Sequence, residues 1–115
     1  MEKDYKIYGI RGATSIEEDT ATLITERVLE LWNEITSKND ITRIISVIFS
    51  VTSDIKSLNP ATVLRKTLNL NSIPFMCLSE SEFENSPTKI IRVLIICESS
   101  TPNFVYLHKA SQLRK

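Results

Sequence analysis

The stretch KIIRVLIICE, residues 89–98, is the most apolar segment of the chain. Its β-branched residues favour a strand, and polar residues border it on both sides. Arg92 is the exception to this apolar pattern. On a strand, its charged side chain lies on the same face as the apolar side chains of Leu94 and Ile96. A guanidinium keeps its proton, so burying one without a partner is strongly unfavourable. Either this strand lies at a sheet edge, where the arginine reaches water, or Arg92 points at an anion or an electron-rich oxygen.

The rest of the chain alternates between strand and helix patterns around this segment. Strands are predicted at residues 5–10 (YKIYGI), 43–51 (RIISVIFSV) and 72–78 (SIPFMCL), and a last short strand followed by a turn or short helix in NFVYLHKASQLRK. An amphipathic helix is predicted over 19–37, with Leu23, Ile24, Val28, Leu31, Trp32 and Ile35 on one face. Asn59-Pro60 marks a second helix start, running to about residue 70, with Leu64 and Leu68 facing the core.

This order of elements, β-α-β-α-β-β plus a tail, predicts an α+β fold. The two helical crossovers and the final pair of strands fit one mixed sheet with both helices on the same face. At 115 residues, 1–115 is expected to form a single domain with a real core.

The only two glycines, Gly9 and Gly12, flank Arg11 in the stretch GIRG. We expect the first strand to end there, with the glycines clearing side-chain bulk so that Arg11 reaches a ligand. A β-bulge that merely ends the strand is the alternative. The motif lacks the spacing of a phosphate-binding loop.

Composition excludes several classes of function. Fourteen basic and fourteen acidic residues give no net charge, so no basic face for nucleic acid or an anionic membrane is expected. The charged start MEKDYKIYG and the absence of a long apolar run predict neither a signal peptide nor a membrane span. Two cysteines without CxxC spacing and one histidine favour reduced thiols, a cytoplasmic location and no metal site.

Five segments together resemble a known family. GIRGATSIEEDT, NPATVLR, PFMCLSE, IIRVLI and VYLHKASQLR are similar, in order and at consistent spacing, to the monofunctional chorismate mutases of the trimeric Bacillus type. The resemblance implies the rearrangement of chorismate to prephenate, on the route to phenylalanine and tyrosine, without cofactor or metal. It also implies a homotrimer with a central pseudo α/β barrel and active sites between subunits.

The resemblance also implies roles for individual residues. Arg92 matches the catalytic arginine at the ether oxygen, Arg11 an arginine that binds a substrate carboxylate, and Glu80 a group at the ring hydroxyl. The implied substrate-binding residues are Tyr106, Arg65, Cys77, Asn59, Ala61, Thr62, Phe75, Met76 and Leu113, with Arg114 beside Leu113 in a closing tail. Asn59 and Thr62 depart from the family, which often has an aromatic residue and a lysine there.

A unimolecular pericyclic reaction accounts for this set of site residues, since such a reaction needs neither a nucleophile nor a general base. Negative charge develops on the ether oxygen, which a fixed guanidinium stabilises. Two alternatives remain at this stage: an imine or enamine deaminase on a similar trimer, and a non-catalytic trimeric binding or regulatory protein.

Overall fold

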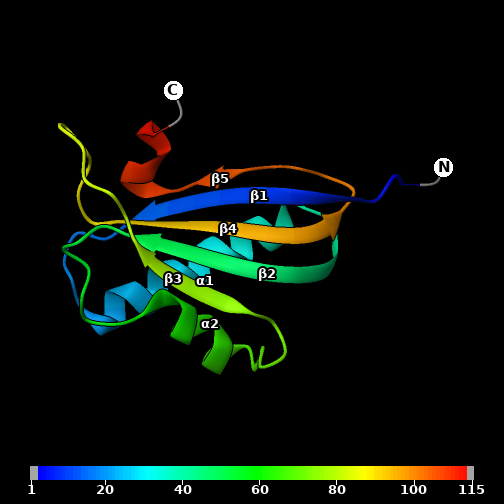
Figure 1. The fold of residues 1–115 in the computed structure, drawn as a ribbon, viewed down its shortest axis with the longest axis horizontal. Coiled ribbons are helices and arrows are strands. Elements are labelled where there is room, and N and C mark those ends of the chain that lie inside the picture. Colours follow the sequence, from blue (N-terminus) through cyan, green and yellow to red (C-terminus); the bar gives the residue numbers. More distant parts are fainter. Residues whose placement is uncertain (1–2, 114–115) are drawn as a thin grey trace.

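A computed structural model describes residues 3–113 of the chain. The elements are β1 (Lys6–Ser15), α1 (Ala21–Ser37), β2 (Ile41–Val51), α2 (Pro60–Thr67), β3 (Phe75–Ser79), β4 (Ile90–Ser99), β5 (Val105–Tyr106) and the 3₁₀ helix η1 (His108–Gln112). One five-stranded sheet has the order β3-β2-β4-β1-β5 (Figure 1). β4 runs antiparallel to both neighbours, β1 and β2, while β3 and β5 pair in parallel at the edges. The predicted mixed sheet is confirmed.

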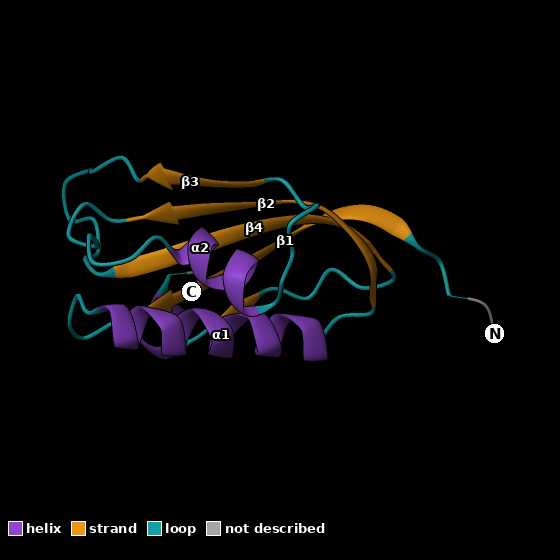
Figure 2. Cartoon of the chain, turned by 90° about the horizontal axis from the view of Figure 1, so that it is seen from below, coloured by secondary structure: helices purple, strands orange, loops and turns teal. Residues whose placement is uncertain are grey.

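Both helices cover the same face of the sheet, as predicted (Figure 2). The core lies between these layers and is built from Ile24, Val28, Leu31 and Ile35 of α1, Val47 and Phe49 of β2, Leu64 of α2, and Ile91, Val93 and Ile95 of β4. The opposite sheet face, which we call the open face, carries the alternate residues of each strand. None of the helices within residues 3–113 is long and apolar enough to cross a membrane.

β1 corrects the expectation for the strand end and for Gly12. The strand does not end at GIRG but continues unbroken to Ser15, paired with β4 along its whole length. A Cβ atom on Gly12 would lie 2.6 Å from Cδ1 of Ile35 and 3.3 Å from Cδ1 of Leu31, both on α1. The missing side chain of Gly12 therefore lets the helix approach the sheet, and it clears no space on the side of Arg11.

Helix ends follow local capping chemistry. The Thr20 hydroxyl accepts a hydrogen bond from the Leu23 amide at 3.2 Å, so α1 begins at Ala21. The Asn59 side chain accepts from the Ala61 amide at 2.9 Å and caps α2. That helix ends at Thr67, before the predicted residue 70, and Leu68 is exposed rather than core-facing.

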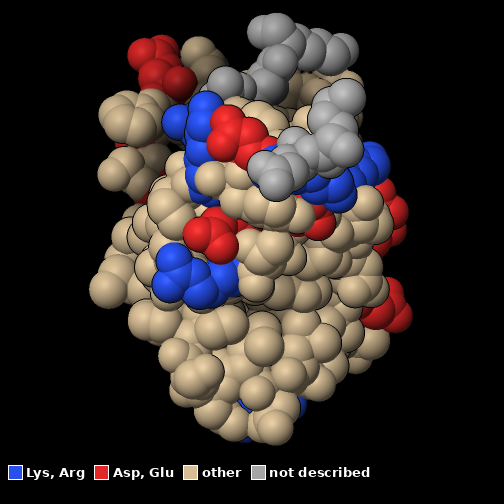
Figure 3. Space-filling model, turned by 90° about the vertical axis from the view of Figure 1, so that its right-hand side faces the viewer, with Lys and Arg blue, Asp and Glu red and all other residues tan. Residues whose placement is uncertain are grey.

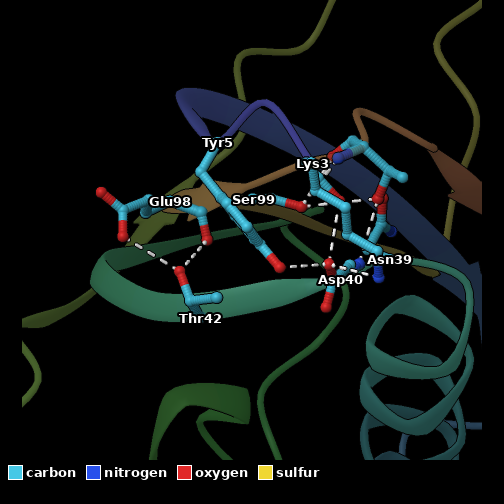
Figure 4. A network of polar contacts seen from close by, with 9 residues as sticks. Lys3, Tyr5, Asn39, Asp40, Thr42, Glu98 and Ser99 are labelled. Carbon is cyan, nitrogen blue, oxygen red and sulfur yellow. Dashed lines mark hydrogen bonds and ion pairs between the residues drawn. The ribbon is translucent and has the colours of Figure 1, made fainter. Parts of the chain in front are cut away.

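A polar cluster closes the end of the sheet where β1 begins (Figure 4). Oδ2 of Asp40 accepts hydrogen bonds from Lys3 Nζ at 3.0 Å, the Tyr5 hydroxyl at 2.7 Å and the Ser100 hydroxyl at 2.9 Å. These bonds, led by that of Tyr5, lower the pKa of Asp40 to about 2. We call Lys3, Tyr5, Asp40 and Ser100 the Asp40 cluster. On this end of the molecule, acidic and basic side chains are intermixed (Figure 3).

Candidate active site

A row of paired residues crosses the sheet near its other end. Backbone register places Ser50 of β2 beside Arg92 of β4, Arg92 beside Ala13 of β1, and Ala13 beside Tyr106 of β5. All four share the open face, because Val93 and Phe49, their neighbours in sequence, are buried in the core. The row thus gathers side chains that are far apart in the sequence.

Arg92 stands in the middle of this row. β4 is the central strand, so the explanation that Arg92 escapes to water at a sheet edge is wrong. Its side chain is 37% exposed on the open face, and Nε lies 2.7 Å from Oε1 of Glu80. Within residues 3–113, Glu80 is the one acidic residue that forms an ion pair with Arg92. The Arg92 guanidinium is therefore bound by Glu80 on one side and can contact a ligand from the other.

Glu80 is the first residue after β3, and two contacts fix it beside Arg92. Its amide donates to the Val51 carbonyl at 2.8 Å, which extends the pairing of β3 with β2 by one residue. The Ser50 hydroxyl donates to Oε1 at 3.0 Å. Ser50 was not among the predicted site residues. Its signal is a hydroxyl in the apolar run RIISVIFSV, but only the sheet register shows that it faces Arg92.

Arg11 lies on the same face as Arg92, one strand away. It pairs with Leu94, so Arg11 and Arg92 are diagonal neighbours, whose spacing is about 7–8 Å in antiparallel sheets. Arg11 is exposed, and no acidic side chain within residues 3–113 forms an ion pair with it. Of these two guanidinium groups only that of Arg92 has a carboxylate partner, so the local charge is positive.

Tyr106 and Leu113 border this region from the carboxyl-terminal side. Both pack against a small cluster of Ala13, Ile90 and Ala110. Hydrogen bonds hold the segment to β1, from the Leu107 amide to the Ala13 carbonyl at 2.9 Å and from the Lys109 amide to Oγ of Ser15 at 3.0 Å. Arg114, also predicted for the tail, lies outside the described residues.

A cleft of about 230 Å³ opens between these side chains. Its lining includes Arg11, Arg92, Tyr106, Ser50 and Ile48, and no residue of α2 or β3. Ligand pockets usually enclose roughly 300–1,000 Å³, so this cleft is smaller than the usual range. No group of three or more acidic, histidine or cysteine side chains within residues 3–113 is placed to hold a metal ion.

The remaining predicted residues form a second group on α2 and β3 that does not line the cleft, although Met76 pairs with Ile48, which does. Ala61 is buried in the core, while Thr62 is half-buried and Arg65 exposed. Asn59 caps α2 through its side-chain oxygen. On β3, Phe75 and Cys77 pack against the core, and Met76 is exposed on the open face. Burial raises the pKa of the Cys77 thiol.

His108 contacts Glu30 of α1, with Nε2 and Oε1 2.7 Å apart. Within residues 3–113, His108 is therefore not paired with a serine or cysteine for which it could act as a base. The site offers positive charge and oriented hydrogen-bonding groups, which suit the binding and polarisation of an anion.

The chain is similar to known proteins in both sequence and structure. The family described as chorismate mutase type I matches residues 7–115. The chain is 34% identical over 115 residues to chorismate mutase AroH of Thermus thermophilus, covering 94% of this chain and 93% of that one. It is 30% identical over 114 residues to the AroH of Bacillus subtilis (strain 168), with 94% and 90% covered. The structure is similar to that of a chorismate mutase from Clostridium thermocellum, with TM-score 0.81 and 33% identity over 90% of this chain and 96% of that one.

Proposed function

This chain belongs to the chorismate mutase type I family, and from that premise we propose how its own residues carry out the isomerisation of chorismate to prephenate. Arg92 is the principal catalytic group. The observation that supports this most strongly is a half-exposed guanidinium at the centre of the sheet, paired on one side only.

The reaction needs charge stabilisation more than proton transfer. The carbon–oxygen bond of the ether breaks ahead of the new carbon–carbon bond, so negative charge grows on the ether oxygen. A donor fixed in place beforehand stabilises that charge more in the transition state than in the ground state. Arg92 suits this task because Glu80 holds Nε, which leaves the Nη atoms to meet the ether oxygen.

Other side chains in the cleft, and Glu80 beside it, bind and orient the substrate. Arg11 pairs with a carboxylate of chorismate, and Tyr106 donates a hydrogen bond near a carboxylate. Glu80 accepts a hydrogen bond from the ring hydroxyl. Holding both ends of the molecule in its compact shape removes conformational entropy from the barrier.

The pocket is completed by a second copy of the chain in a homotrimer. The second group of predicted residues, on α2 and β3, supplies the missing wall from the neighbouring subunit. Two observations support this: the cleft of one chain is small and open, and the open face carries exposed apolar side chains such as Ile7, Met76 and Leu78. Exposed apolar surface of this kind marks interfaces. A cytoplasmic location is part of the proposal, supported by the free cysteines Cys77 and Cys97.

Complementation between two inactive variants tests the mechanism and the shared site together. Arg92→Ala removes the catalytic group of the cleft, and Arg65→Ala changes only the second group. Each variant alone should lose most chorismate consumption, measured continuously with prephenate identified as product. After co-refolding in equal amounts, about a quarter of the sites should combine two intact halves in a closed ring of subunits.

Recovery of activity to about that fraction supports a site shared between subunits. If the mixture stays as inactive as its components, the shared site is wrong. If the unaltered protein consumes no chorismate, the assignment of the reaction to this chain fails.

A further inference from the structure

Ser50 contacts the ion pair between Arg92, which lines the cleft, and Glu80, which lies beside it. Its hydroxyl donates to Oε1 of Glu80 at 3.0 Å, and the same oxygen lies 2.7 Å from Nε of Arg92. In the register of the sheet Ser50 pairs with Arg92 on one side and with Leu78, two residues before Glu80, on the other. The Ser50 hydroxyl, inside β2, therefore contacts the carboxylate of Glu80, which lies just after the end of β3.

Glu80 needs such a contact because its backbone position alone leaves the carboxylate free to rotate. A glutamate side chain loses rotamer entropy when it is fixed. The ion pair with Arg92 supplies one constraint, but two partners on one oxygen define the rotamer far better than one. No hydrogen bond within residues 3–113 reaches Oε2 of Glu80.

We propose that Ser50 is a positioning residue for the reaction. By holding Oε1 it turns Oε2 of Glu80 toward the ring hydroxyl of chorismate, and it keeps Nε of Arg92 engaged so that the Nη atoms face the ether oxygen. This inference rests on the proposed function, and it adds a residue that acts through Glu80 without touching the substrate.

The test compares three substitutions at one position. Ser50→Ala removes the donor and should lower kcat/KM about tenfold, since a hydrogen bond to a charged group is worth that much. Ser50→Cys has nearly the same shape but a weak donor, and should lose most of the same amount. Ser50→Thr keeps the hydroxyl and should stay within about twofold of the unaltered protein.

Ser46→Ala is the matched control, because Ser46 lies on the same strand and pairs with Ile96, away from the cleft. It should leave kcat/KM unchanged. A double-mutant cycle then separates positioning from general structure: in a Glu80→Ala background, Ser50→Ala should have no further effect on kcat/KM.

Each outcome decides the inference. Full activity of Ser50→Ala, or an equal loss in the Glu80→Ala background, overturns it while leaving the proposed function in place. Equal losses in Ser50→Ala and Ser50→Thr also overturn it, because shape rather than the hydroxyl would then matter. If the unaltered protein forms no prephenate, the proposed function fails and the inference falls with it. Thermal unfolding of each variant shows whether a loss of activity is a loss of fold.

Discussion

The sheet carries a polar cluster at each end, and the two differ in how completely their charges are satisfied. In the Asp40 cluster, one carboxylate oxygen accepts hydrogen bonds from Lys3 and Tyr5, both labelled in Figure 4, and a third from Ser100. At the other end, Arg92 has one acidic partner, and Arg11 has none among residues 3–113. The first cluster joins an amino-terminal segment to two loops. The second holds positive charge over an open cleft.

This difference separates a structural cluster from a binding site. Both clusters are partly exposed and both contain ordinary charged residues, so residue types alone do not distinguish them. A carboxylate with several donors gains little from a ligand, whereas guanidinium groups with at most one acidic partner on rigid strands bind an anion at small reorganisation cost. The predictions below test this contrast, from the largest expected effect to the smallest.

Arg92→Lys should lower turnover of chorismate by about 10²–10³, because an ammonium cannot both pair with Glu80 and present a fork to the ether oxygen. Arg43→Lys is the control: Arg43 lies on β2 toward the Asp40 end, with Nη2 4.0 Å from Oε2 of Glu98. Its activity should not change. Turnover near that of the unaltered protein in Arg92→Lys would contradict the proposed mechanism.

Arg11→Gln should lower kcat/KM about 10–100-fold, the range for losing a charged hydrogen-bonding partner. The effect should appear mainly in KM, because Arg11 is proposed to bind a carboxylate in ground state and transition state alike. Steady-state kinetics separates the two constants. A fall in kcat with an unchanged KM would place Arg11 at the reacting atoms instead.

Gly12→Val should destabilise the fold by about 1–3 kcal/mol, because added side-chain atoms collide with Ile35 and Leu31 of α1. Urea unfolding measures the change. Folded Gly12→Val protein should keep its KM, since the new side chain points to the helices and away from Arg11. A raised KM with unchanged stability would restore the idea that this glycine makes room for a ligand.

Asp40→Asn should have the smallest effect and leave kcat/KM unchanged. The lowered pKa of Asp40 means that its contribution to stability is complete above about pH 4, the range of an unfolded aspartate. That contribution is lost as the pH falls through about 2, the pKa in the fold. Between these values the unaltered protein should lose stability more steeply than Asp40→Asn in thermal unfolding. Parallel curves would show that the cluster does not stabilise the fold.

Much of the architecture was predictable because it follows from local patterns. The apolar face of α1 and the Asn59-Pro60 start of α2 lie where helical spacing and capping chemistry predicted them. The predictions were wrong where packing between segments distant in the sequence decided the structure. β1 passes through GIRG because β4 pairs with it to Ser15, and α2 stops early so that Leu68 is exposed.

The candidate site was predictable in part. Arg92 stood out because an arginine among isoleucines needs an explanation, and the family resemblance added Arg11, Glu80 and Tyr106. Ser50 could not be found in this way, because a serine in a strand is common and its partner is thirty residues further along the chain. The roles of these residues toward chorismate stay predictions that the experiments above test.

The sequence by itself determined which segments become strands and helices, which faces are apolar, and which family the chain resembles, because these depend on the order of residue types. Only the tertiary structure decided that β4 is central, that Ser50, Glu80 and Arg92 meet on the open face, and that the second group of predicted residues does not line the cleft. Strand order and register are set by contacts between distant segments, and no local pattern encodes them.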